Sequence, residues 1–377
     1  MLKRVLIGLT LLGACAGAHA DPALQNFLST TLATARDKAH LPAVAGLVQI
    51  DGKIEAQVAL GVREIGRPEA VGPDDRWHLG SDTKAMTATM IARLVERGDL
   101  GFDETLGQIF PGIAARMDAQ LRNVTLTQLL SHTSGLPALS SEQEMTEFLG
   151  VMEHEKKVRG QRAMVALHYL IRPPVSKVGE FAYSNLGYVI AGAAAEARTG
   201  KTWEELIESE IWKPLGIKRA GFGPPGKAGS IGEPRGHVER GGKLVALEPG
   251  EPGSDNPPAI GPAGTVNISL NDWLLFAQDQ LAGIHGHGKL LKPETYRKLH
   301  TPVTRNYALG WGVLRDQEGS ITLLTHMGSN GFWVSDVRIM PKHDVIFLTA
   351  MNAGGPVAEN TAREIGKILQ ERLKTID

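Results

Sequence analysis

The sequence predicts an α+β fold: an antiparallel β-sheet formed by strands from both ends of the chain, flanked by terminal helices, with an inserted all-helical lobe. Two observations support this prediction. Segments rich in β-branched and apolar residues, separated by turn residues, occur near both ends of the 377-residue chain. The long middle of the chain shows helical periodicity instead. Because strands and helices do not alternate along the chain, a doubly wound α/β fold is not expected.

The N-terminal part of the sheet is predicted as a β-hairpin. Residues 44–50 and 53–62 are strand-like, and Asp51-Gly52 lies between them. An Asp-Gly pair supplies the positive φ angles that a two-residue hairpin turn needs. The amphipathic stretch at 23–39 precedes the hairpin and predicts the first terminal helix.

The C-terminal part of the chain predicts the remaining strands. Four segments rich in β-branched and apolar residues, at 307–314, 321–325, 332–340 and 345–351, are separated by turn residues. An amphipathic segment at 357–373 follows them and predicts the second terminal helix. The strands of both ends would form one sheet.

The middle of the chain predicts the helical lobe. Helical periodicity occurs at 85–97, 125–130, 142–153, 158–170, 186–199 and 203–211. We therefore expect residues 21–84 plus 300–377 to form an α/β sheet domain, and residues 85–299 a mainly helical domain. Within the latter, residues 221–264 are dense in Gly and Pro and predict an irregular excursion. A loop of that length in a compact protein is either mobile or functional.

The first twenty residues predict an export signal. A basic start is followed by an apolar run at 5–12 and by the small-residue cleavage site Ala18-His19-Ala20, so the mature chain would begin at Asp21. An alternative is open, because the residues that end in Cys15 resemble a bacterial lipoprotein cleavage box, in which Cys15 becomes the lipid-anchored first residue.

Composition excludes several classes of function. Cys15 is the only cysteine, so a mature chain without it forms no disulfide and no thiolate metal site. The formal net charge of −1, without long Lys/Arg runs, gives no reason to expect nucleic acid as a partner. No apolar stretch reaches the roughly 20 residues of a transmembrane helix. His285 and His287 lack a third metal ligand. A small-molecule or peptide substrate is expected, without metal or cofactor, and nothing indicates an oligomeric state.

The sharpest chemical signal is Ser81-Asp82-Thr83-Lys84 at the start of an apolar helical segment. Residues i and i+3 share one helix face, so the Ser81 hydroxyl and the Lys84 amine can lie within hydrogen-bond distance. A lysine can take the proton of a serine only if burial or nearby positive charge lowers the pKa of its amine. The helix start also presents backbone N–H groups to a developing oxyanion. The competing interpretation is an N-cap serine with a surface lysine.

Two further segments complete a recognisable set. Tyr183-Ser184-Asn185 precedes a predicted helix, and His326-Met327-Gly328 ends a predicted strand. In this order the three elements resemble the S-x-x-K, Y-x-N and K/H-x-G motifs of the serine β-lactamase and penicillin-binding protein superfamily. The resemblance is strongest to the branch of class C β-lactamases, DD-carboxypeptidases and family VIII esterases. Segments at 77–80, 129–136, 261–264 and 309–312 also look like recurring segments of this branch.

The resemblance implies catalytic roles for three residues. Ser81 would form the acyl-enzyme, Lys84 would help to deprotonate it, and Tyr183 would shuttle protons to the leaving group and from water. Nearby positive charge is expected to lower the pKa of Tyr183 for this task. Either Lys84 or Tyr183 could be the general base. The competing interpretation of Tyr183 and Asn185 is a helix-start turn with a capping asparagine.

The resemblance also implies substrate-binding residues. Asn185 would hold substrate through its amide, His326 and Gly328 belong to the third motif, and the N–H of Ser329 would form the oxyanion hole with that of the nucleophile. Class C β-lactamases usually have Lys-Thr-Gly here, whereas this chain has a histidine that is mostly neutral at pH 7 and Met327, which has no hydroxyl. Anion recognition should therefore be weaker. A structural histidine at a strand end is the competing interpretation of His326.

These residues predict a serine acyl hydrolase that works through an acyl-enzyme on an amide or ester, without a cofactor. A D-Ala-D-Ala peptide, a small ester and a β-lactam all remain possible substrates, and the altered third motif favours a carboxypeptidase or esterase over an efficient β-lactamase. The alternative is a catalytically weak penicillin-binding or cell-wall-sensing protein of the same fold. With the export signal, the family indicates a bacterial protein exported to the periplasm.

Overall fold

The computed structural model describes residues 21–304 and 306–375. The expected export signal at 1–20, with the alternative anchor Cys15, lies outside the described residues. Within the described ranges, no helix combines the length and the apolar character that a membrane span requires.

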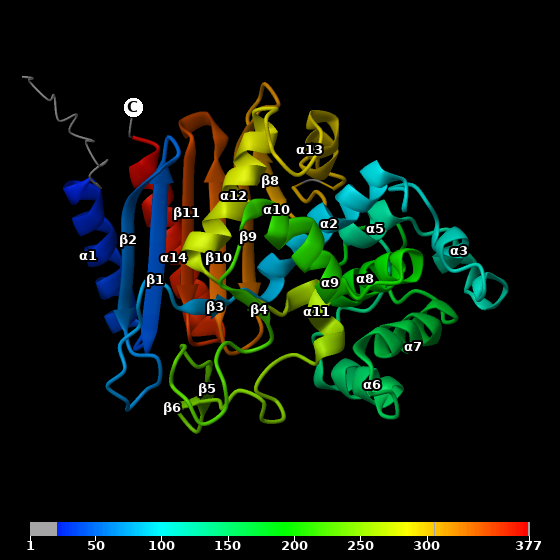
Figure 1. The fold of residues 1–377 in the computed structure, drawn as a ribbon, viewed down its shortest axis with the longest axis horizontal. Coiled ribbons are helices and arrows are strands. Elements are labelled where there is room, and N and C mark those ends of the chain that lie inside the picture. The colour runs from blue at the N-terminus through cyan, green and yellow to red at the C-terminus, as the bar shows by residue number, and fades with distance from the viewer. Residues whose placement is uncertain (1–20, 305, 376–377) are drawn as a thin grey trace, which may run out of the picture.

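Strands from the two ends of the chain form one six-stranded antiparallel sheet, as predicted (Figure 1). Its order is β2 (Lys53–Gly61), β1 (Ala43–Ile50), β11 (Val345–Met351), β10 (Val334–Met340), β9 (Ile321–Ser329) and β8 (Gly312–Arg315). The pairing of β1 with β11 joins the two ends, with Leu47 opposite Leu348. The predicted hairpin turn is present, because Asp51 and Gly52 have φ angles of 48° and 76°.

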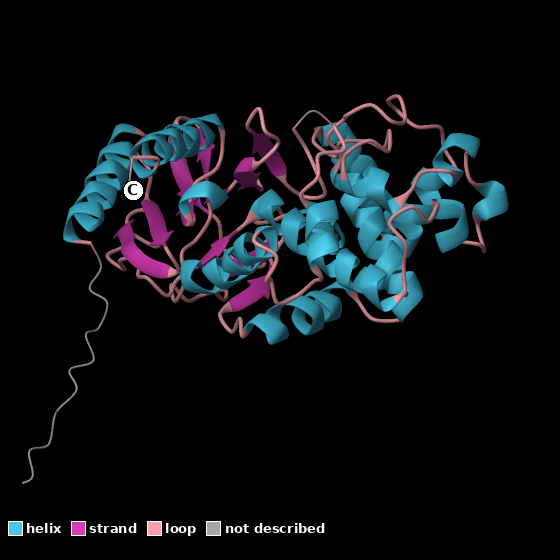
Figure 2. Cartoon of the chain, turned by 90° about the horizontal axis from the view of Figure 1, so that it is seen from above, coloured by secondary structure: helices cyan, strands magenta, loops and turns pink. Residues whose placement is uncertain are grey.

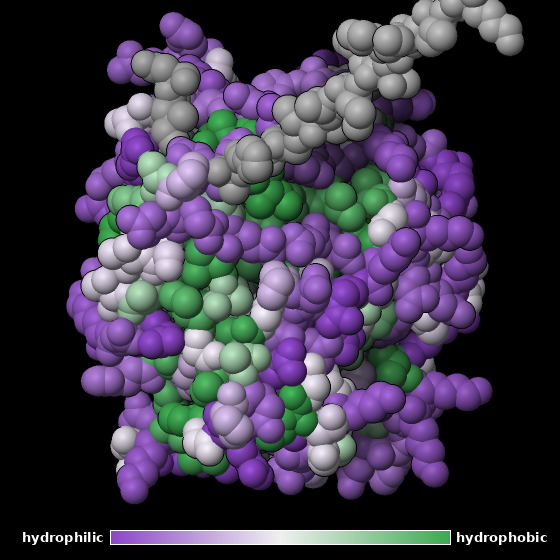
Figure 3. Space-filling view, turned by 60° about the vertical axis from the view of Figure 1, so that its left-hand side comes forward, coloured by the Kyte–Doolittle hydropathy of each residue, from purple (hydrophilic) through white to green (hydrophobic). Residues whose placement is uncertain are grey.

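Helices cover both faces of the sheet, and its central strands are therefore buried on both sides. On β1, Val44 and Val48 belong to an apolar cluster with helices α1 (Pro22–Lys38) and α14 (Pro356–Leu373). Alternate residues of a strand point to opposite faces, and Leu47 accordingly belongs to the other cluster, with α12 (Leu270–Ile284). Figure 2 shows α1 and α14 outside the strands and the helical part beyond the opposite side. On the α1 side the surface is mostly hydrophilic (Figure 3).

The helical part is organised around α2 (Thr83–Arg97), which is almost wholly buried. The remaining helices are α3 (Leu106–Ile109), α4 (Ala119–Arg122), α5 (Leu126–Leu130), α6 (Glu142–Met152), α7 (Val158–Leu170), α8 (Asn185–Thr199), α9 (Trp203–Ile207), α10 (Lys213–Leu215), α11 (Gly261–Gly264) and α13 (Pro293–Leu299). The predicted helix at 203–211 is α9 followed by a π-helical turn at Glu208–Trp212.

The inserted segment also contains short strands, which periodicity did not reveal. In it, β7 (Val266–Ser269) pairs on one side with β3 (Arg76–His78) and on the other with β4 (Ala220–Phe222), which gives a three-stranded sheet. A hairpin of β5 (His237–Arg240) and β6 (Lys243–Ala246) lies within the Gly/Pro-rich excursion. Strands of three or four residues are too short to show a reliable alternation. The domain boundaries proposed above remain a prediction.

The predicted strand at 307–314 is shorter in the structure. Only β8 is extended, and the residues before it form a turn in which Gly310 has a φ angle of 79°. A Cβ atom at Gly310 would lie 2.9 Å from the carbonyl oxygen of Lys84. The turn therefore lies directly on the backbone of α2, and this close approach requires glycine.

The turn that precedes α2 crosses β9 at very short range. A Cβ atom at Gly328 would lie 1.9 Å from the carbonyl oxygen of Leu79, and one at Gly80, whose φ is +48°, would lie 2.5 Å from the backbone nitrogen of Ser329. Two glycines on opposite sides of the contact thus allow residues 79–82, the nucleophile turn, to touch the strand that ends at Ser329.

Gly328→Ala is expected to separate the nucleophile turn from β9 and to lower the free energy of unfolding by about 2 kcal/mol or more, since neither backbone can yield cheaply. Urea unfolding followed by circular dichroism measures the change. Gly150→Ala in α6 is the control, because an added Cβ meets no atom within 4 Å there; alanine should leave stability unchanged or raise it. Equal midpoints for the two variants would contradict the crossing.

Candidate active site

Ser81 and Lys84 come together at the start of α2, as their spacing predicts. A tight 3₁₀ turn, Gly80–Asp82, leads into the helix, so the two side chains share one face. The Lys84 Nζ atom lies 2.9 Å from Ser81 Oγ. Lys84 is fully buried, which excludes the competing interpretation of a surface lysine.

The start of α8 brings the second motif to the same point. Tyr183 donates a hydrogen bond from its hydroxyl to Ser81 Oγ at 2.8 Å, and Asn185 Oδ1 lies 2.8 Å from Lys84 Nζ. The helix is capped by Ser184, whose Oγ accepts the N–H of Gly187. The amide of Asn185 is therefore free to hold the amine of Lys84.

The partners of Lys84 fix the arrangement of its hydrogens. Besides Ser81 Oγ, its Nζ contacts Asn185 Oδ1 at 2.8 Å and the carbonyl oxygen of Ala263 at 2.7 Å. These two oxygens only accept, so they take two hydrogens. A neutral amine then has its lone pair left for the Ser81 hydroxyl. Burial lowers the pKa of Lys84 well below its ordinary value, against the opposing charge of Asp82.

Tyr183 departs from the expectation for its pKa. Burial of its hydroxyl end raises this pKa, and the hydrogen bond with Ser81 opposes the increase only in part. The neighbouring amine of Lys84 supplies no charge when it is neutral, which explains why the expected lowering does not occur. Tyr183 as a whole residue is 37% exposed, while its hydroxyl points at the nucleophile. Tyr183 is thus a proton donor at neutral pH.

His326 lies behind the site, not on its surface. Its Nδ1 donates to the carbonyl oxygen of Met327 at 3.0 Å and lies 3.2 Å from Asp82 Oδ1, while its Nε2 accepts from the Tyr307 hydroxyl at 3.2 Å. Alternation along β9 turns His326 and Gly328 toward the nucleophile turn. Both ring nitrogens are thus occupied, which favours the competing interpretation of a structural histidine; substrate binding by His326 stays a prediction. For Gly328 the evident role is the close crossing.

The hydrogen bonds of His326 continue into a buried chain that sequence reasoning missed. His132 Nδ1 accepts the N–H of Ser184 at 3.1 Å, so its Nε2–H donates to the Tyr307 hydroxyl at 3.1 Å, and Tyr307 in turn donates to His326. The His132 ring also packs against Tyr183, with centroids 4.2 Å apart. The only local signal was the position of His132 within the family-like segment at 129–136.

His132 and His326, the two histidines of this hydrogen-bonded chain, are neutral at pH 7. Burial lowers the pKa of His326 to about 3 and lowers that of His132 well below its ordinary value; a protonated Lys84 would lower both pKa values further. Every ring nitrogen has a partner in these neutral forms. The third motif therefore contributes no positive charge to the site.

The nucleophile turn lies against the end of β9 directly beside Ser81. A Cβ atom at Gly80, the residue before Ser81, would lie 2.5 Å from the backbone nitrogen of Ser329. That the N–H groups of Ser81 and Ser329 form an oxyanion hole remains a prediction, and this close approach is compatible with it.

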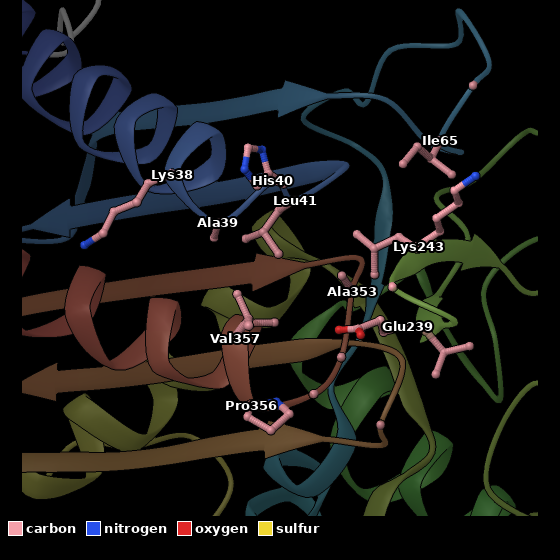
Figure 4. A pocket seen from close by; sticks show the side chains of 18 residues that line it. Lys38, Ala39, His40, Leu41, Ile65, Glu239, Lys243, Ala353, Pro356 and Val357 are labelled. Carbon is pink, nitrogen blue, oxygen red and sulfur yellow. The ribbon is translucent and has the colours of Figure 1, made fainter.

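Other features of the described residues offer no rival site. No three His, Cys, Asp or Glu side chains gather there as metal ligands would. A cavity of about 1000 Å³ lies at the end of the sheet, bounded by the end of α1, the β5–β6 hairpin and the start of α14 (Figure 4). The residues that line this cavity include Lys38, His40, Glu239 and Lys243, but no serine, threonine or cysteine that could act as a nucleophile.

Comparison with known proteins agrees with this geometry. A family model described as Beta-lactamase matches residues 28–370. Penicillin-binding protein 4 of Amycolatopsis lactamdurans is 28% identical over 85% of this chain and 83% of its own length. The structure of an octameric penicillin-binding protein homologue from Pyrococcus abyssi superposes with a TM-score of 0.73 at 22% identity, covering 92% of this chain and 77% of that one.

A second solved structure extends the comparison. EstCE1, described as a hydrolase with promiscuous acyltransferase activity, matches with a TM-score of 0.73 at 18% identity and covers 91% of this chain and 98% of its own. At these identities the solved structures establish the fold, while the family model spans every residue of the site described above. The chain therefore belongs to the β-lactamase family of serine hydrolases, which includes penicillin-binding proteins, esterases and amidohydrolases.

Proposed function

We propose that the protein is a serine acyl hydrolase in which Lys84 is the general base. The observation that carries this proposal is the hydrogen count at Lys84, since two acceptor-only partners leave the lone pair of a neutral amine for Ser81. Ser81 Oγ attacks the carbonyl carbon while its proton passes to Lys84. The oxyanion is stabilised by the N–H groups of Ser81 and Ser329.

Tyr183 completes the proton transfers. Its phenol proton passes to the leaving group as the carbonyl–leaving-group bond breaks, and the proton gained by Lys84 restores the phenol. Water then attacks the acyl-enzyme, and its proton follows the same route in reverse. The raised pKa of Tyr183 suits an acid better than a base, which supports Lys84 in the other role.

The proposed substrate is an ester or amide without a carboxylate beside the scissile bond. The third motif has a neutral His326 where a class C β-lactamase has lysine, and Met327 packs against the apolar cluster of α1 and α14. Phe181 is 49% exposed beside Tyr307, with ring centroids 5.7 Å apart, and adds an apolar surface at the mouth of the site. An uncharged ester with an apolar group fits these surroundings best.

Ser81→Ala is expected to reduce hydrolysis of p-nitrophenyl butyrate by about 10⁴-fold or more, because it removes the group that forms the acyl-enzyme. Mass spectrometry of the protein with a fluorescent penicillin and with the ester should detect a single adduct on the wild type and none on the variant. Equal reactivity of the two proteins would show that Ser81 is not the nucleophile. A stable adduct without turnover on any substrate would favour the penicillin-binding alternative.

The substrate proposal predicts a preference between two matched esters. An acyl-D-alanyl thioglycolate, whose thiol leaving group carries a free carboxylate, and the methyl ester of that carboxylate share the same scissile thioester bond and differ only in this charge. The value of kcat/KM should be higher for the methyl ester because no cation of the third motif receives the charge. The ratio of the two kcat/KM values should become smaller at high salt if repulsion between the protein and the substrate carboxylate contributes, because salt screens charges. A clear preference for the carboxylate would instead support a carboxypeptidase.

The pH dependence distinguishes the two candidate bases. Neutral Lys84 is the active form, so kcat/KM for an uncharged ester should rise with pH, level off above the lowered pKa of Lys84 and be lost as pH falls through it. Tyr183→Phe should lower kcat by about 10²-fold or more yet keep this acid limb. Lys84 would be contradicted as the base if kcat/KM fell with an apparent pKa near the ordinary lysine value of 10.5. It would also be contradicted if Tyr183→Phe abolished this fall in activity at low pH.

A further inference from the structure

We propose that Asp255 is a positioning residue that holds the two halves of the oxyanion hole in register. This inference rests on the proposed function, in which the N–H groups of Ser81 and Ser329 stabilise the oxyanion. Asp255 lies in the Gly/Pro-rich excursion at 221–264, far in sequence from both halves. Its two carboxylate oxygens bind a different half each.

The first oxygen reaches the nucleophile turn through His78. The N–H of Gly80 donates to His78 Nδ1 at 3.0 Å, so Nδ1 has no hydrogen of its own. The ring hydrogen is then on Nε2, which lies 3.0 Å from Asp255 Oδ2. The side chains of His78 and Asp255 are 0% and 6% exposed, so solvent does not compete for either group. Asp255 thereby fixes the tautomer of His78 and, through the N–H of Gly80, the Leu79–Gly80 peptide, which lies one peptide before Ser81.

The second oxygen reaches the end of β9 through Asn330. The Asn330 Nδ2 group donates to Asp255 Oδ1 at 2.7 Å, and Asn330 Oδ1 accepts the N–H groups of Phe332 and Trp333, both at 3.1 Å. This amide therefore closes the turn that directly follows Ser329. With one oxygen on each side, the carboxylate joins the nucleophile turn to the end of β9, in addition to the glycine crossing and the contact of Asp82 with His326.

The effect of this bridge should appear in the transition state and not in substrate binding. The oxyanion forms only as Ser81 attacks, and its N–H donors must already be aimed at the position that it will occupy. A small misalignment costs stabilisation of the transition state with little change in ground-state affinity. The Gly/Pro-rich excursion thereby gains a specific role, since it delivers the bridging carboxylate.

Asp255→Asn tests the bridge with almost no change of shape. The amide can still accept from Asn330, but its NH₂ group then faces the Nε2–H of His78, and the two donors cannot pair. We expect kcat to fall by about 10- to 100-fold with KM nearly unchanged. Affinity for phenylboronic acid, which forms a tetrahedral adduct on a serine, should fall by the same factor as kcat/KM. The matched control is Glu251→Gln in the same excursion, which should leave both quantities unchanged.

A merely structural role makes a different prediction. A variant with a lower unfolding midpoint but unchanged kcat and boronate affinity would overturn the proposal, as would a rise in KM alone. If Asp255→Asn does not fold, Asn330→Ser breaks only the β9 half and must produce the same loss of kcat. Failure of the proposed function is distinguishable, because Ser81→Ala would then retain wild-type activity and no variant of Asp255 would matter.

Discussion

The buried amine of Lys84 is the interaction on which the rest of the site depends. A lysine with no exposure must be either neutral or paired with a charge, since an isolated buried ammonium is unstable. Here two acceptor oxygens, from Asn185 and Ala263, hold the amine so that a lone pair is available to Ser81. The helix α8 and the short helix α11 supply these oxygens, so two segments distant in sequence must pack against α2.

The histidines near this amine are also uncharged. His132 and His326 lie in one hydrogen-bonded chain with Tyr307 between them, and each would repel an ammonium at Lys84 if it were protonated. A chain of neutral groups therefore adds no positive charge beside Lys84, while burial keeps its pKa low against the opposing effect of Asp82. The same neutrality removes the cation that a carboxylate-bearing substrate would need, so the proposed base and the proposed substrate preference have one physical origin.

Much of the fold could be predicted because its signals are local. The Asp51-Gly52 turn and the apolar, β-branched strands of both ends gave the sheet, and helical periodicity gave α2, α7 and α8. The short strands β4 and β7 were not predicted, because pairing and not pattern makes them strands. Their position matters, since they pair beside β3, which leads directly into the nucleophile turn.

The sequence by itself determined which residue types would perform the chemistry: a serine and a lysine at helical spacing fix their own contact, because one helix turn brings them together. Only the tertiary structure decided the direction of the pKa of Tyr183, the inward orientation of His326 and the pairing of Asp255 with both halves of the oxyanion hole. These properties depend on burial and on contacts with residues distant in the chain. The spacing of neighbouring residues in the sequence reveals neither of these.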